Sequence, residues 1–142
     1  MTIQYAHETM LYFKTSENIE YPLLIKYVSH THHSKKSLHR FLNDLALTSQ
    51  KELRTQKNLS IQLLNTYHLS LFYLNPKLIL CPMQPQRAPV QIYINMVQVI
   101  AASSYFEQTK VHFEHNITLI VPIPLIQFIK KWKDAMMLSK LL

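Results

Sequence analysis

Four histidines lie close together near residue 30, and their spacing raises the question of a metal site. His30, His32 and His33 stand in the stretch HTHH, and His39 follows six residues after the last of them. Imidazole binds zinc readily, but a tetrahedral site needs further ligands, and this segment offers no acid or cysteine at ligand spacing. We therefore predict an exposed polar loop without a metal, to which partial protonation of the histidines would add positive charge.

Catalytic chemistry has little support elsewhere in the chain. Cys81 is the single cysteine, so it cannot form an internal disulfide, and its apolar surroundings predict a buried, inert thiol. The chain has no glycine, which excludes the loops that cradle nucleotide phosphates. Its eight acidic residues are scattered, with no close pair for two-metal chemistry. We expect a protein that is not an enzyme and needs no cofactor.

The strongest functional feature is a basic segment from Ser29 to Lys57. It holds six Lys or Arg and four His residues against two acids, in a chain of 142 residues with a formal net charge of +7. Such a balance favours a polyanionic partner, nucleic acid before an anionic membrane surface. The candidate DNA-binding residues are Lys35, Lys36, Arg40, Lys51, Arg54 and Lys57. A solvated basic helix face without a partner is the alternative.

The spacing within this segment predicts how the cations are held. Leucines between Leu38 and Leu47 recur at helical spacing, with Ser37 or Ser34 as the N-cap. The first three cations then lie near a helix N-terminus, where free N–H groups and the helix dipole also favour phosphate. The last three recur every third residue, so a second short helix, opened by a capping box at Ser49, would align them on one face.

A hairpin and an amphipathic helix are predicted at the end of the chain. His115 and Asn116 form the turn. The next segment, 117–123, is predicted to be a strand, and its prolines restrict it to a sheet edge or a strand end. Pro124 suits a helix start, and Lys130, Lys131 and Asp134 would lie on the outer face of the helix. The apolar stripe consists of Leu125, Phe128, Ile129, Trp132 and Met136. We predict that this stripe serves association; covering the sheet of a compact monomer is the alternative.

The remaining segments complete one α+β domain over residues 1–142. Apolar patterns predict strands within 1–14, at 59–64, 67–74 and 77–83, and over 90–101, with a connection at 103–109. We thus expect a mostly antiparallel sheet, a basic helical middle segment and a C-terminal amphipathic helix. The longest apolar run, 117–126, is too short to span a membrane, and no signal peptide is evident, so we expect a cytoplasmic protein.

Several of these stretches together resemble the ComK family of bacterial competence transcription factors. LILCPMQPQRAPVQIYINM, 78–96, is similar to a family block in which a strand ends before a proline, a polar loop follows, and an aromatic–Ile pair opens the next strand. Residues 113–132 resemble the next block of strand, Asn-containing turn, strand and aromatic, basic helix. Residues 37–54 are similar to the family's helical block, and 5–10 match its first strand loosely. The chain departs from the family in lacking its glycines and its further basic C-terminal sequence.

The resemblance implies a DNA-binding activator of DNA-uptake genes. It further implies binding to A/T-rich boxes as a homodimer or higher oligomer, through the minor groove, and control by an adaptor that delivers the protein to a Clp protease. Lys and Arg suit such a groove because its narrowness concentrates negative potential. The alternative is a shortened relative, a protein-interaction module that dimerises with or titrates a full-length protein.

Overall fold

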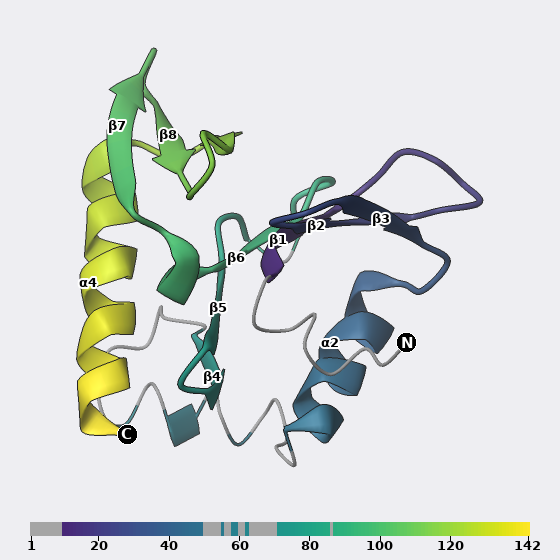
Figure 1. The fold of residues 1–142 in the computed structure, drawn as a ribbon, viewed down its shortest axis with the longest axis horizontal. Coiled ribbons are helices and arrows are strands. Elements are labelled where there is room, and N and C mark those ends of the chain that lie inside the picture. The colour runs from purple at the N-terminus through teal and green to yellow at the C-terminus, as the bar shows by residue number, and fades with distance from the viewer. Residues whose placement is uncertain (1–9, 50–54, 56–57, 60–61, 63–70, 86) are drawn as a thin grey trace.

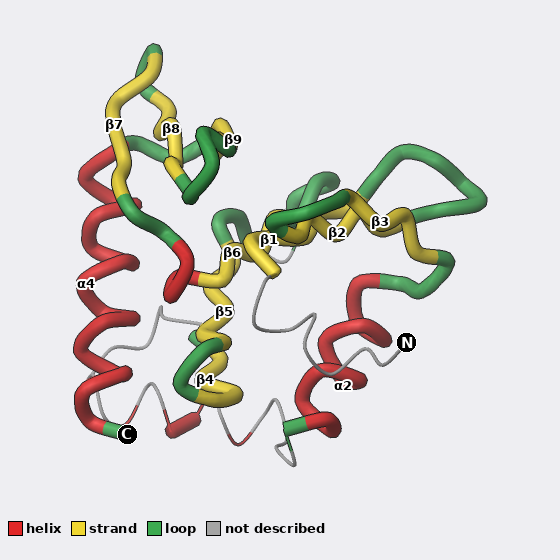
Figure 2. The backbone as a smooth tube through the Cα atoms, in the orientation of Figure 1, coloured by secondary structure: helices red, strands yellow, loops and turns green. Residues whose placement is uncertain are grey.

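The computed structural model describes residues 10–49, 55, 58–59, 62, 71–85 and 87–142, and these form an α+β fold (Figures 1 and 2). This confirms the predicted fold class. The elements are β1 (Met10–Thr15), β2 (Leu23–Tyr27), β3 (Thr31–Ser34), α2 (Leu38–Thr48), β4 (Phe72–Asn75), β5 (Leu78–Pro82), β6 (Ile92–Asn95), the 3₁₀ turn η1 (Met96–Gln98), β7 (Ala101–Tyr105), β8 (Gln108–His112), β9 (Thr118–Val121) and α4 (Leu125–Leu141).

The strands form two antiparallel sheets. The larger has six strands in the order β3-β2-β1-β6-β5-β4, and the smaller is a β7-β8-β9 meander. The central strands of the larger sheet are apolar on both faces because both faces are covered. In β5, Leu78 and Leu80 face a core shared with α2, whereas Ile79 and Cys81 face a second core shared with α4 and the small sheet. The two helices consequently lie at opposite sides of the molecule (Figure 1).

A fully buried amide joins three strands of the larger sheet. Asn95, at the end of β6, donates from Nδ2 to the carbonyl oxygens of Met10 at 3.0 Å and Lys77 at 3.1 Å. Its Oδ1 accepts from the N–H of Ile79 at 3.2 Å. These contacts satisfy backbone groups at the point where the chain leaves the sheet, a buried position where an unpaired polar group would be costly.

Two hairpin turns are made without glycine. The predicted turn at His115 and Asn116 is confirmed, with φ of 62° and 60°, which matches a type I′ turn. A second such turn joins β7 to β8, where Phe106 has φ of 46° and Glu107 has φ of 65°. Residues other than Asn, Asp and Gly rarely adopt this left-handed region, so the sequence did not indicate the second turn.

Three predicted segments need correction. The strand over 90–101 is interrupted: β6 ends at Asn95, η1 turns the chain, and β7 begins at Ala101 in the other sheet. The connection at 103–109 is part of the β7–β8 hairpin. The two residues of the predicted strand 59–64 that the structure describes, Leu59 and Gln62, have helical backbone. Alternation marks extended backbone, but it does not show where a chain passes from one sheet to another.

Candidate nucleic-acid interface

The candidate interface lies where β3 leads into α2. Ser37 is the N-cap, as predicted: its hydroxyl accepts a hydrogen bond from the backbone N–H of Arg40 at 3.2 Å. Ser34 stabilises the preceding turn, because its Oγ accepts from the N–H of Lys36 at 3.1 Å. Leu42 and Leu45 anchor the helix to the larger sheet. Hydrogen bonds from the two serines therefore stabilise the start of the helix, and the two leucines pack its later turns against the sheet.

The three described candidate residues differ in their surroundings. Lys36 Nζ lies 2.6 Å from Asp44 Oδ2 in a half-exposed ion pair. Lys35 is exposed, with Nζ 5.9 Å from the centre of the Tyr21 ring. Arg40 is exposed and makes no ion pair within the described part of the chain. The three residues thus lie just before α2 and in its first turn, and the ammonium group of Lys36 reaches the carboxylate of Asp44 farther along the helix.

The other three candidate residues, Lys51, Arg54 and Lys57, lie outside the described residues. The same holds for the second helix that we predicted to carry them. Ser49, the proposed start of its capping box, is described, and its N–H donates to the carbonyl oxygens of Leu45 and Ala46 at the end of α2.

The four histidines are exposed and held by different neighbours. The rings of His30 and Tyr27 stack with centroids 4.8 Å apart, and His39 Nε2 lies 3.0 Å from Nδ2 of Asn43. The predicted loop is wrong for His32 and His33, which are exposed but belong to the edge strand β3. Among the described residues, no three His, Cys, Asp or Glu side chains are placed to hold a metal ion. Metal independence remains a prediction, which elemental analysis of protein purified without added metal would test.

The predicted stripe on α4 is largely turned toward the chain's own core. Phe128 is completely buried, and Trp132 and Met136 are partly buried against the same core, while Leu125 and Ile129 are half-buried. Phe128 therefore covers the sheet of the monomer, as the alternative expected. Association through the exposed parts of the other four residues stays a prediction.

The buried face of α4 is rotated relative to the predicted one. Ala135 and Leu138, which the stripe omitted, are fully buried. Asp134 was expected on the outer face, yet its side chain is only 17% exposed and contacts Lys130 at 3.3 Å. Lys131, expected on the outer face as well, is half-buried. The buried face therefore includes the small residue Ala135, which the spacing of large apolar residues alone did not show.

Cys81 lies beneath this part of α4, buried as predicted. Burial raises the pKa of its thiol to about 12; the charge of Lys131 opposes that rise and the charge of Asp134 adds to it. The thiol is therefore protonated at neutral pH and lacks the thiolate character of a nucleophile.

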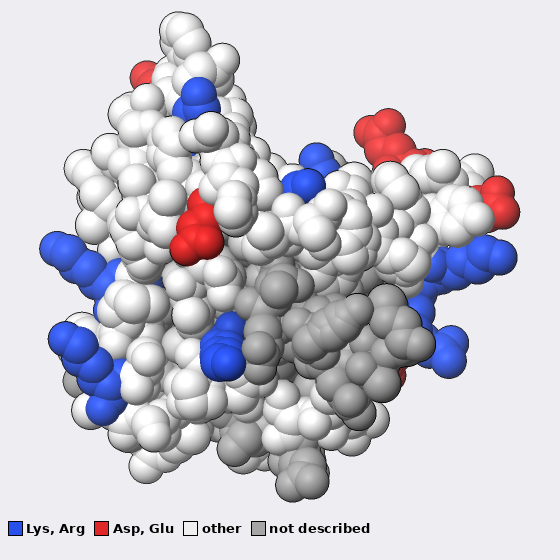
Figure 3. Space-filling model, viewed as in Figure 1, with Lys and Arg blue, Asp and Glu red and all other residues white. Residues whose placement is uncertain are grey.

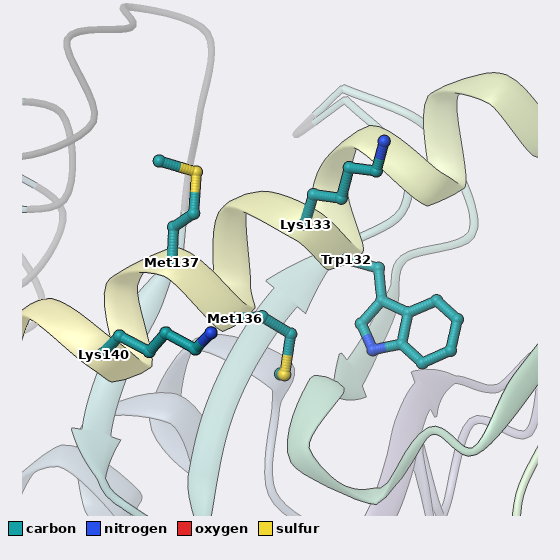
Figure 4. Close-up of a pocket in the computed structure, with 5 residues that line it drawn as sticks. All are labelled: Trp132, Lys133, Met136, Met137 and Lys140. Atoms are coloured by element: carbon teal, nitrogen blue, oxygen red, sulfur yellow. The ribbon is translucent and has the colours of Figure 1, made fainter.

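The rim of α4 also lines a groove of about 330 Å³. Its described walls come from Trp132, Lys133, Met136, Met137 and Lys140 (Figure 4). The surface view shows Lys and Arg side chains along the edge that α4 occupies and again at the opposite edge, near the start of α2 (Figure 3). Other Lys and Arg side chains lie between these edges, so positive charge is spread over the visible face (Figure 3).

Two contacts of the candidate DNA-binding lysines were not indicated by the sequence. Tyr21 precedes Lys35 by fourteen residues in a loop, and Asp44 lies at no helical spacing from Lys36, which is outside the helix. Both contacts arise from the way β2 and β3 return the chain to α2.

Comparison with known proteins adds no assignment. The chain matches no protein-family model, no curated protein and no solved structure. No helix in the described part is long and apolar enough to cross a membrane.

Proposed function

We propose that the chain binds double-stranded DNA through the cations at the start of α2. The observation that carries this proposal is the grouping of Lys35, Lys36 and Arg40 around a capped helix N-terminus, in a chain of net charge +7. Free N–H groups of the first helical turn and these side chains favour the same ligand, a backbone phosphate.

The ion pair between Lys36 and Asp44 is compatible with this role. Their side chains are 46% and 41% exposed, so the pair is solvated and contributes little to stability. A phosphate can therefore compete with the carboxylate for Lys36 at small cost. Lys35 is exposed and its Nζ lies 5.9 Å from the centre of the Tyr21 ring, at the outer limit of a cation–π contact, so its ammonium group is also open to a phosphate.

The biological role that we propose rests on the resemblance to the ComK family. It is that of a cytoplasmic transcription factor of the competence (DNA-uptake) regulon that reads A/T-rich promoter boxes. Oligomeric binding and control by a Clp-protease adaptor belong to the same proposal.

A binding titration with A/T-rich and G/C-rich duplexes of equal length tests this function. We expect tighter binding to the A/T-rich duplex, and affinity that falls linearly with the logarithm of salt concentration. Replacing Lys35 and Arg40 with Ala should weaken binding to both duplexes by similar factors and flatten the salt slope by about 0.9 for each lost phosphate contact. The same measurement on Lys51, Arg54 and Lys57, replaced together, tests the rest of the predicted set.

A matched control removes two exposed lysines from α4, Lys133 and Lys140. It changes the net charge equally, so a specific interface at α2 predicts a clearly smaller effect. Equal losses in the two double variants, or a wild-type protein that binds neither duplex, would contradict the proposed interface.

The alternative function, a protein-interaction module, has an observation of its own. Ile126 is 83% exposed, Met137 54% and Leu141 55%, so α4 presents apolar side chains to solvent. The module would bind a related chain but no DNA, and the same titration distinguishes the two functions.

A further inference from the structure

Strand β7 is an edge of the small sheet that lacks the usual protection against pairing. It hydrogen-bonds to β8 on one side, and none of the strands that the structure describes pairs with its other side. Four of its five residues are exposed, and the stretch from Ile100 to Phe106 contains no charge and no proline. Natural edge strands are commonly blunted by such residues; β9, the opposite edge, is followed directly by Pro122.

The backbone of β7 offers hydrogen-bonding groups at two outward positions. A two-residue turn joins Tyr105 to Gln108, and such a turn makes the flanking residues a hydrogen-bonded pair. Because pairing alternates along an antiparallel ladder, Ser103 also bonds toward β8, while the N–H and C=O groups of Ala102 and Ser104 point away from it. An antiparallel partner strand would satisfy these groups.

We infer that the partner is β7 of a second copy of this chain, paired antiparallel about a two-fold axis at Ser103. The arrangement of side chains around Ser103 carries this choice. The axis sets Ala102 opposite Ser104 of the second copy and Ala101 opposite Tyr105 of the second copy. Each pair therefore joins two small residues or one small residue and one large ring. The same pairing repeats on the other side of the axis, as an isologous contact requires.

The ends of the strand favour the same partner. Ile100 at one end is 57% exposed, and Phe106 at the other is 83% exposed. They flank β7 at equal distances in sequence from Ser103, so the two-fold pairing brings the end of β7 at Ile100 near the β7–β8 turn of the other copy, which carries Phe106. No like charges meet across the axis. An unrelated extended peptide would cover the backbone groups but would not reproduce this match at both ends.

The resulting assembly joins two three-stranded sheets into one of six strands. The contact is a short strand pair with two apolar clusters, which places it among small interfaces and predicts a weak dimer that forms at high protein concentration. This inference does not depend on DNA binding.

Sedimentation of the full chain over a concentration series, without DNA, measures the dimer. The test variants are Ser103→Glu and Ser103→Lys, because the axis sets position 103 against itself at the close spacing of a non-hydrogen-bonded pair. Like charges directly opposite should weaken each homodimer by up to about fivefold. An equimolar mixture of the two variants should dimerise again, because a heterodimer sets Glu against Lys.

Gln108→Glu is the matched control. Gln108 is exposed on the neighbouring strand β8, away from the axis, so the same charge change there should leave dimerisation unchanged. Circular dichroism verifies that each variant folds. Amide hydrogen exchange gives a residue-level measurement: exchange at Ala102 and Ser104 should slow as wild-type concentration rises.

Three results would overturn the inference. The first is a wild-type chain that stays monomeric up to its solubility limit. The second is a folded Ser103→Glu variant that dimerises like the wild type. The third is a mixture of the two charged variants that remains monomeric, since only a position opposed to itself is rescued by opposite charges.

Discussion

The Nζ of Lys36 lies 2.6 Å from Oδ2 of Asp44, and this ion pair joins the turn before α2 to the middle of the helix. Among the acidic residues that the structure describes, Asp44 alone forms an ion pair with one of the three described candidate DNA-binding residues. Its removal is therefore the most direct way to strengthen the proposed interface.

We expect Asp44→Asn to bind DNA more tightly than the wild type, by up to about fivefold, because an exposed ion pair of this kind contributes at most about 1 kcal/mol. The salt slope should steepen by about 0.9 as Lys36 gains a phosphate contact. Fluorescence anisotropy in a salt series measures both quantities. Glu114→Gln, the same charge change at the exposed β8–β9 turn, is the control; an equal gain there would show that only net charge matters.

Phe128→Ala separates packing from association on α4. Phe128 is fully buried, so its truncation should lower the free energy of unfolding by about 3–5 kcal/mol, as measured by urea denaturation. Ile126→Ala, which removes a side chain that is 83% exposed, should change it by no more than about 0.5 kcal/mol. Unchanged stability of Phe128→Ala together with loss of a dimer would instead place the stripe at an interface.

The glycine-free turn between β8 and β9 should be improvable. Replacing His115 with Asn and Asn116 with Gly introduces the pair that a type I′ turn favours, at positions with φ of 62° and 60°. We expect the free energy of unfolding to rise by about 1 kcal/mol, because glycine adopts positive φ without strain. Thr118→Gly, in the adjacent strand, should lower it, and a loss of stability in the turn variant would contradict the assigned backbone conformation.

Stability should fall in alkaline solution in part because of Cys81. Burial raises the pKa of the folded thiol from 9.0 to about 12, so the unfolded chain releases this proton first as pH rises. The contribution of the thiol is therefore complete below pH 9.0 and is lost between pH 9.0 and about 12. Burial also raises the pKa of Tyr12, Tyr27 and Tyr93, which acts in the same direction.

Urea titrations at several pH values would measure this loss, and Cys81→Ser would serve as a comparison. The serine variant should show a flatter decline above pH 9.0 because serine does not titrate there. Rapid modification of native Cys81 by a thiol reagent at pH 8 would count against its burial.

The amino-acid sequence by itself determined the local features of this protein. Ser37 marked the start of α2 because a hydroxyl can cap free N–H groups, and the prolines around Ile123 marked where β9 ends and α4 begins. Asn116 marked a turn because its side chain tolerates positive φ. These are interactions within a few residues, so their signals lie close together in the chain.

The tertiary structure alone decided how these segments combine. The alternation over 90–101 was compatible with one strand, but only packing divides it between two sheets at η1. The rotation of α4 buries Ala135 and Leu138 against the core, and the contact of Lys36 with Asp44 follows from the path of the chain into α2. Such features depend on contacts between residues that no local pattern relates, since several packings satisfy the same hydrophobic period.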